Sequence, residues 1–259
     1  MSIPVFRWRS PHERFLFLLS PLLVIFAWVW VSRLGLFPDQ ILVPPQHVWE
    51  AALGLWESGE LQMHLQQSLY RLVIGFSVGA LLGVAFGILI GLSNTVENAC
   101  SPLFHAIRQV PTVAFIPMLI LVFGVEETFK IIIVAKAAFF PVALATHDAV
   151  RGIPKAYFEV ARAYRLPTWL LVWRIILPST VPPVLTGLRI SLGRSWMVLV
   201  AAELLAADSG IGQMMEMGRQ MFRIDIVMVG VFVTGLIGFS LDRLFRSLEG
   251  RLVKWKHQS

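Results

Sequence analysis

The sequence predicts an all-α membrane protein with about six transmembrane helices, and three observations support this fold class. Hydrophobic residues make up 56% and charged residues 15% of the 259 residues, and the mean hydropathy is +0.71. A soluble domain of this length would be less apolar. Four long stretches, residues 15–32, 72–96, 109–125 and 226–241, contain no Asp, Glu, Lys or Arg. The basic residues lie between such stretches and at the two ends, which is typical of membrane proteins.

The expected spans cover residues 15–34, 69–92, 102–123, 129–146, 178–205 and 226–245. Each is long enough to cross a bilayer, which takes roughly 17 to 25 helical residues. No small-residue cleavage site follows the first apolar stretch, so it is expected to remain as a span. No convincing repeat occurs, and residues 1–259 are expected to form one transmembrane domain with its core over about 65–245. The single cysteine, Cys100, excludes an internal disulfide framework.

Charge asymmetry predicts the orientation of these spans. With a cytoplasmic N-terminus, the inside segments hold thirteen basic residues: Arg7, Arg9, Arg14, Arg151, Lys155, Arg162, Arg165, Arg174, Arg243, Arg246, Arg251, Lys254 and Lys256. The outside segments hold only Lys130, Arg219 and Arg223. Because cytoplasmic loops are enriched in Lys and Arg, both termini are expected in the cytoplasm. The net charge of +6 is accounted for by this pattern, and no nucleic-acid-binding motif accompanies it.

Residues 35–68 carry several acidic residues, three prolines and no Lys or Arg, so they read as an external segment with a short amphipathic helix near residues 48–56. The second span then has glycine at every fourth position: Gly75, Gly79, Gly83, Gly87 and Gly91. Small residues at this spacing allow two helix backbones to approach closely. We interpret the glycine seam as a helix-packing surface and not as a ligand site.

The fifth span carries charge at membrane depth, where each charged group costs roughly 2.5 to 3.5 kcal/mol. At about 100 degrees per residue, Arg189, Trp196 and Glu203 share one face, whereas Arg194 points elsewhere. We assign these four residues to a translocation path. Arg194 is the favoured anion contact, since a guanidinium presents a planar fork that matches a pair of oxyanion oxygens. The alternative is that the arginines snorkel or pair internally with residues such as Glu203 or Asp242.

A short helix is expected over residues 155–166, since Pro154 suits a helix start and Pro167 prevents continuation. It is too short to cross a bilayer. Tyr157, Val160, Ala161 and Tyr164 form an apolar stripe beside a charged stripe of Lys155, Glu159 and Arg162. Spacing alone also fits a helix that lies on the membrane surface.

This segment carries a resemblance to a known family. Residues 159–164, Glu-Val-Ala-Arg-Ala-Tyr, followed by Ile-Ile-Leu-Pro ending at Pro178, resemble the EAA motif of binding-protein-dependent ABC importer permeases. In this chain Arg165 stands where that motif usually has glycine. Residues 42–46, 109–117, 123–127, 187–189, 200–204 and 209–212 are similar, in order, to the sulfonate, taurine and nitrate branch.

The resemblance implies two copies of the permease around one pathway, two cytoplasmic ATP-binding subunits that dock on the EAA helices, and an external solute-binding protein. It also implies a bacterial-type inner membrane as the location of the chain. It assigns the contact with the ATPase to Tyr157, Glu159, Ala161, Arg162, Arg165 and Pro178. No Gly-x-x-x-x-Gly-Lys-Ser/Thr loop occurs in the chain, so ATP and magnesium are expected on the partner subunits and no cofactor in this chain. The expected function is import of a small oxoanion, most simply an aliphatic sulfonate, with taurine or nitrate as alternatives.

Two functions of other classes remain open from the residues alone. An ion-gradient carrier could use Lys136, Glu203 and Asp242 as relay groups, but no clear inverted repeat supports it. A membrane-embedded enzyme is disfavoured because His105 and His147 lie in no metalloprotease spacing and no nucleophile elbow occurs.

Overall fold

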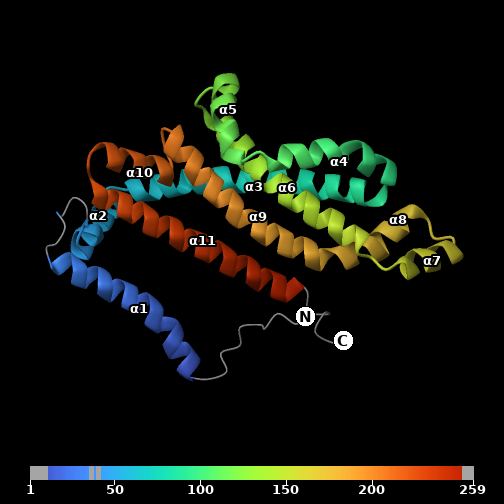
Figure 1. Ribbon diagram of the computed structural model, residues 1–259, viewed down its shortest axis with the longest axis horizontal. Helices are drawn as coiled ribbons and strands as arrows, with labels where there is room; N and C mark the ends of the chain where they lie inside the picture. The colour runs from blue at the N-terminus through green and yellow to red at the C-terminus, as the bar shows by residue number, and fades with distance from the viewer. Residues whose placement is uncertain (1–10, 35–37, 39–41, 253–259) are drawn as a thin grey trace.

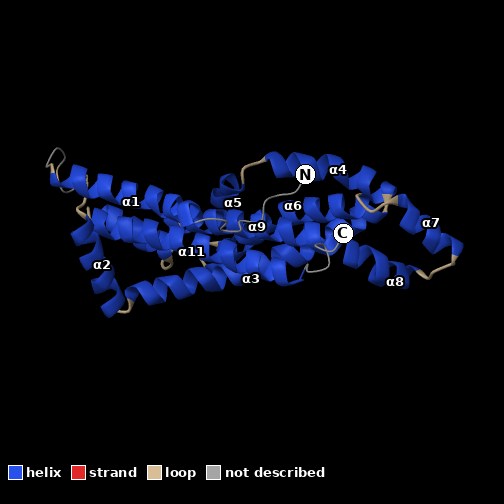
Figure 2. Ribbon diagram, turned by 90° about the horizontal axis from the view of Figure 1, so that it is seen from below, coloured by secondary structure: helices blue, strands red, loops and turns tan. Residues whose placement is uncertain are grey.

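The computed structural model describes residues 11–34, 38 and 42–252, and within these residues every regular element is a helix (Figure 2). The basic residues Arg7, Arg9, Lys254 and Lys256, which contribute to the predicted orientation, lie outside the described residues. The elements in order are α1 (Pro11–Arg33), α2 (Pro45–Glu57), α3 (Glu60–Leu92), α4 (Asn94–Gln109), η1 (Thr112–Phe115), α5 (Ile116–Phe123), α6 (Glu127–Arg151), α7 (Lys155–Ala163), α8 (Thr168–Leu171), η2 (Val172–Ile176), α9 (Leu177–Leu205), α10 (Ile211–Gln220) and α11 (Ile224–Leu252).

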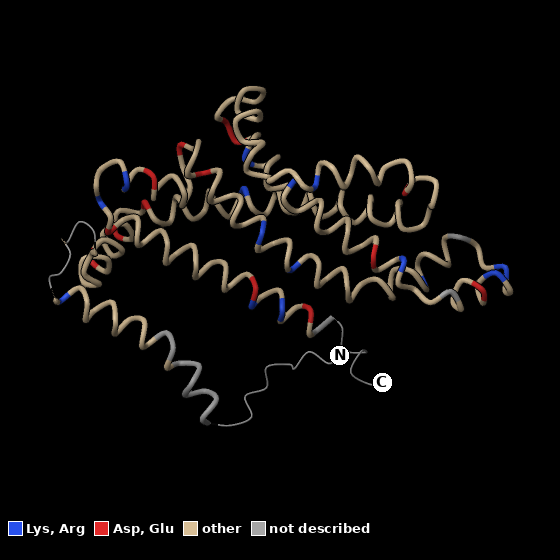
Figure 3. Tube along the Cα trace, viewed as in Figure 1, with Lys and Arg blue, Asp and Glu red and all other residues tan. Residues whose placement is uncertain are grey.

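The all-helical membrane fold is confirmed. Four helical segments of the described chain, residues 60–92, 127–151, 169–205 and 224–250, are long and apolar enough to cross a membrane. The helix α1 covers the expected first span and contacts α11 through Trp28, whose ring stacks on Phe232 at 5.6 Å. The long helices carry few charged residues along their middle parts, and α7 carries several at one end of the molecule (Figure 3).

The expected third span, residues 102–123, is not one straight helix. The helix α4 ends at Gln109, and the pair formed by residues 94–109 and 112–123 is bent by 90°. The break falls at Val110, which is extended with φ −73° and ψ 121° because the ring of Pro111 disfavours the α conformation in the residue before it. The helix α5 therefore projects from the bundle (Figure 1).

The glycine seam of α3 packs against α6, as predicted. A Cβ atom placed on Gly75 would lie 2.8 Å from the carbonyl oxygen of Ile131, and one on Gly83 would lie 2.8 Å from that of Phe139. A Cβ atom on Gly87 would lie 2.5 Å from the carbonyl oxygen of Ala143, which is also on α6. Because these neighbours are backbone atoms, only glycine allows the two helices to approach this closely.

The helix α9 lies across α3 and α6 and completes the core (Figure 1). Phe129, Ile133 and Leu199, all fully buried, belong to the central cluster, and Leu72 of α3 packs with them. A second cluster joins α2, α10 and α11, which places the expected amphipathic helix, here α2, at the opposite end from α7. We refer to these two ends as the α2 end and the α7 end.

Candidate functional site

The α7 end contains the short helix that the sequence predicts. The helix α7 ends at Ala163, three residues before the expected limit of 166, because the chain turns there. The N–H of Leu166 donates to the carbonyl of Ala161 at 2.9 Å, and the N–H of Arg165 donates to that of Arg162 at 3.0 Å. This pair of bonds is a Schellman motif, which requires a left-handed residue in the position that Arg165 occupies.

Arg165 has φ 48°, in the left-handed region that favours glycine. The turn therefore keeps the geometry that a glycine would supply, although this sequence has arginine there. A left-handed conformation costs an L-residue roughly 1–2 kcal/mol relative to its preferred one. Arginine at this position therefore makes the turn less stable than glycine would.

The two sides of α7 face different surroundings. Tyr157 and Val160 are 52% and 54% exposed, and Glu159 and Arg162 are exposed beside them. Ala161 is 4% exposed, so its small side chain allows close packing within this chain. Part of the expected apolar stripe, together with Glu159 and Arg162 of the charged stripe, is thus directed away from the bundle.

The base of α7 is fixed to the bundle by apolar contacts. Phe158 packs against the buried residues Val150, Ile153 and Ile176, which join the end of α6 to the π-helical segment η2. Pro178 follows directly, is exposed, and lines a cleft of about 540 Å³ between the end of α6 and the start of α9. Proline has no N–H for the helical bond to the carbonyl four residues earlier, which accounts for a wider helical turn before it.

A second cluster at this end ties α4 to α6. His147 lies 3.1 Å from a carboxylate oxygen of Glu97 and 3.0 Å from that of Asp148, and Arg151 also pairs with Glu97. This arrangement agrees with a structural role for His147. Among the described residues, no group of three or more His, Cys, Asp or Glu side chains could hold a metal ion.

Of the four residues assigned to the translocation path, three are engaged within the chain. Arg189 pairs with Glu249 at 3.1 Å and with Asp242 at 3.6 Å, which is the internal pairing that the sequence left open. Trp196 is 3% exposed, and its indole N–H donates to the carbonyl of Thr234 at 3.1 Å. Their roles in transport stay predictions.

Glu203, the third, belongs to a buried ionic cluster that the sequence analysis missed. All five N–H groups of Arg71 are engaged: two donate to Glu127, at 2.5 and 2.6 Å, and one to Glu203, at 2.8 Å. The remaining two donate to the hydroxyl and the carbonyl of Ser209, each at 2.6 Å. Both Arg71 and Glu203 have side chains that are 0% exposed.

The ionic cluster connects four helices. Glu203 also accepts from the hydroxyl of Ser68 on α3 and from the N–H of Gly212 on α10, and Glu127 on α6 pairs with Lys130 at 3.2 Å. Arg71 lies inside the expected second span, so the insertion cost that drew attention to the fifth span would have identified it as well.

Arg194, the fourth path residue, is exposed and lines a groove of about 270 Å³ between α4, α6 and α9. Arg108, Thr112 and Lys136 also line the groove, together with apolar side chains that include Phe140 and Met197. The Nζ atom of Lys136 lies 4.1 Å from the centre of the Phe115 ring and 5.3 Å from that of Phe140. No carboxylate lines this groove, which lies beside the break between α4 and η1.

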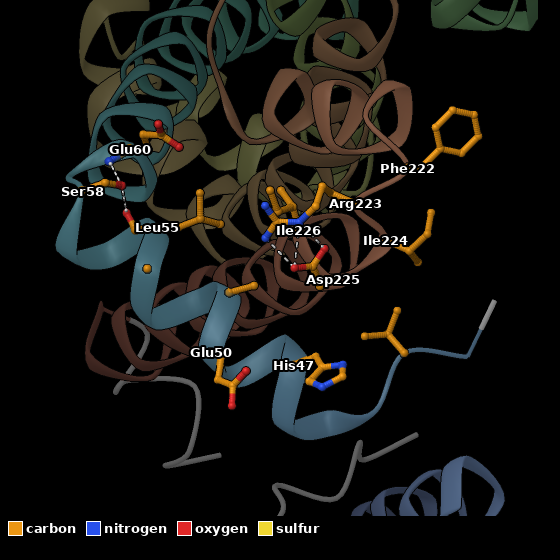
Figure 4. A pocket seen from close by; sticks show the side chains of 13 residues that line it. His47, Glu50, Leu55, Ser58, Glu60, Phe222, Arg223, Ile224, Asp225 and Ile226 are labelled. Carbon is orange, nitrogen blue, oxygen red and sulfur yellow. Dashed lines mark hydrogen bonds and ion pairs between the residues drawn. The ribbon is translucent and has the colours of Figure 1, made fainter. Parts of the chain in front are cut away.

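A wide cleft of about 630 Å³ lies at the α2 end, between α2 and the turn that joins α10 to α11 (Figure 4). Arg223 and Asp225 form an ion pair of 2.6 Å in it, while Glu50 and His47 project from α2 (Figure 4). The hydrogen bond to Asp225 raises the pKa of Arg223. Neighbouring Phe222 is 84% exposed with φ 57°.

Comparisons with known proteins agree with this architecture. Residues 80–254 match the family described as binding-protein-dependent transport system inner membrane component. The chain is 38% identical over 240 residues to a putative aliphatic sulfonates transport permease protein, SsuC, of Bacillus subtilis, covering 93% of this chain and 87% of that protein. It is 35% identical to the taurine transport system permease protein TauC of Escherichia coli, covering 96% and 93%.

A less similar relative and a solved structure also match this chain. The nitrate import permease protein NrtB of Synechocystis is 32% identical, with 74% of this chain and 70% of that protein covered. A chain of the MetNI methionine ABC transporter in an inward-facing conformation has the same fold, with a TM-score of 0.55 and 19% identity over 71% of this chain and 94% of that chain. The chain therefore belongs to the permeases of binding-protein-dependent ABC importers, in the branch that includes the sulfonate, taurine and nitrate permeases.

Proposed function

We propose that this chain forms the membrane path of an ATP-driven importer for a small oxoanion, with an aliphatic sulfonate as the first candidate. Two copies line the path, two cytoplasmic ATP-binding subunits carry ATP and magnesium, and an external solute-binding protein delivers the anion. The observation that carries this proposal is α7: a helix with a charged, aromatic face directed away from the bundle, in a chain with no ATP-binding loop of its own.

The geometry of α7 supports a role in coupling to the ATPase. A helix can transmit work only if its contacts with the partner differ between two conformations. Glu159 and Arg162 offer charges at the surface of α7, and Tyr157 offers an aromatic contact, while Phe158 fixes the helix to α6 and η2. A force on the exposed face of α7 would therefore be transmitted to two membrane-crossing helices. The turn at Arg165 and the start of α9 at Pro178 set the angle at which α7 joins them.

The substrate class is supported by the printed functions of the relatives together with the charge of the groove. Proteins named for sulfonate, taurine and nitrate transport match this chain over most of its length, and each of these solutes carries an oxoanion group. Arg194 is exposed in a groove that no carboxylate lines, as expected of an anion contact. The sulfonate is preferred because the match to the sulfonate permease has the higher identity.

Co-purification from membranes with the ATP-binding subunit tests the coupling role. We expect Glu159→Lys to reduce recovery of the ATPase or its stimulation by substrate, because the new charge opposes the contact. Glu57→Lys, the same change at an exposed position of the α2 end, serves as the control and should leave recovery unchanged. Wild-type transport and wild-type stimulated ATPase activity in Glu159→Lys would count against the proposal.

A further inference from the structure

The groove between α4, α6 and α9 brings together three basic side chains from three helices. Arg71, Lys130 and Arg189 each have a carboxylate partner within 4.0 Å. Arg108, Lys136 and Arg194 have no ion pair with any described residue, although they lie on three different helices that meet at one groove. Three positive charges that share a groove repel one another, and an anion bound between them would offset this repulsion.

Contacts with two aromatic rings fix the position of the Lys136 side chain. Its ammonium group lies over the faces of two rings, Phe115 of η1 and Phe140 of α6. Ring faces attract a cation without neutralising it. The lysine is thereby held toward the groove while its charge stays available for a ligand.

The walls of the groove suit an anion that carries a short apolar group. Its volume, about 270 Å³, lies below the range of roughly 300–1,000 Å³ typical of pockets for drug-sized ligands. Phe140, Met197 and Val198 supply apolar surface in the same groove as the cations. Nitrate would leave this surface without a partner, whereas a short alkanesulfonate would cover it.

We infer that this groove is the site that holds the transported anion within the membrane, with Lys136 and Arg194 on its oxygens, Arg108 and Thr112 beside them, and the apolar wall against its organic group. The inference rests on the proposed function and deepens it, because it names the contacts and favours an alkanesulfonate over nitrate. It adds Lys136, Arg108 and Thr112 to Arg194, the anion contact that the sequence favours.

A pair of substitutions at Met197 tests the site without removing any core contact. Met197 lines the groove and is 71% exposed. Met197→Glu places a carboxylate on the wall, and Met197→Gln is nearly the same shape without the charge. In proteoliposomes with the complete importer, we expect the KM for ethanesulfonate uptake to be roughly ten-fold higher in the glutamate variant than in the glutamine variant.

Lys136→Met and Arg243→Gln provide a second comparison. Each removes one positive charge, but Arg243 lies exposed on α11 outside the groove. We expect Lys136→Met to reduce ethanesulfonate uptake roughly ten-fold or more while Arg243→Gln leaves it unchanged. Nitrate should compete with ethanesulfonate only weakly in the wild-type importer.

These experiments distinguish a failure of the anion site from a failure of the proposed function. Equal KM values for the two Met197 variants, or unchanged uptake in Lys136→Met, would overturn the groove as the anion site while ATP-driven import itself stood. Nitrate that competes as strongly as an alkanesulfonate would overturn the assignment of the apolar wall. A wild-type complex that imports no oxoanion would contradict the proposed function, and this inference with it.

Discussion

Removal of the Arg71 guanidinium is the most informative perturbation of the fold. Its five N–H groups join α3 to Glu127 of α6, Glu203 of α9 and Ser209 in the connection to α10. Arg71→Met keeps much of the side-chain volume but leaves Glu203 without its cation. The ion pairing at Glu127 is affected less, because its side chain is 47% exposed and it also has Lys130.

The expected loss follows from these contacts. Removing one partner of a buried ion pair costs about 3–5 kcal/mol. Glu203 retains hydrogen bonds from Ser68 and from the N–H of Gly212, so the lower part of this range, about 3 kcal/mol, applies. With about 2–4 °C per kcal/mol for a chain of this size, the unfolding midpoint should fall by roughly 6–12 °C.

Thermal unfolding of the detergent-solubilised protein measures this loss, and the double variant Arg71→Met/Glu203→Gln supplies the control. If the cost comes from an uncompensated carboxylate, the amide in the double variant should recover much of it, so that the two changes are strongly non-additive. Additive effects, or a midpoint within 2 °C of wild type for Arg71→Met by the same assay, would refute the reasoning.

Three further changes test separate parts of the structure. Gly87→Ala should destabilise the bundle by about 1–3 kcal/mol, because its Cβ would lie 2.5 Å from an α6 carbonyl oxygen, whereas Gly193→Ala, with no atom within 4 Å, should be neutral or slightly stabilising in thermal unfolding. Arg165→Gly should stabilise the α7 turn by about 1 kcal/mol, and slower hydrogen exchange of α7 amides would be the sign of this. The hydrogen bond from Arg219 lowers the pKa of Glu216 from 4.5 to about 2. The stabilisation of the folded protein by this ion pair is therefore present above about pH 4.5 and is lost as the pH falls through about 2. An NMR titration of Glu216 with a midpoint near 4.5 would contradict this.

Local patterns predicted much of this fold because they act over a few residues. The glycine repeat from Gly75 to Gly91 identified a packing face, and Pro154 with Pro167 bounded a short helix, since each feature constrains its own neighbours. The break at Val110 was missed, although the residue before a proline disfavours the helical conformation. The apolar residues on both sides of Val110 predicted one continuous span, and hydropathy alone does not reveal the 90° bend.

Contacts between distant residues could not be predicted in the same way. Ser68 and Glu203 are 135 residues apart, and nothing in the sequence near either one indicates the other. The groove likewise forms only where α4, α6 and α9 meet. The sequence therefore identifies Lys136 as a charged residue in a span but does not predict which side chains surround it. The sequence favours Arg194 as an anion contact because its guanidinium matches a pair of oxyanion oxygens, and the structure adds which cations accompany it.

Uptake of a labelled alkanesulfonate by sealed proteoliposomes is the most direct test of the central claim. The vesicles should contain the permease with its ATP-binding subunit, and the solute-binding protein should be outside. We expect accumulation only when hydrolysable ATP reaches the ATPase, and no uptake when a non-hydrolysable analogue replaces ATP. Accumulation without ATP that follows an imposed proton or sodium gradient would contradict it.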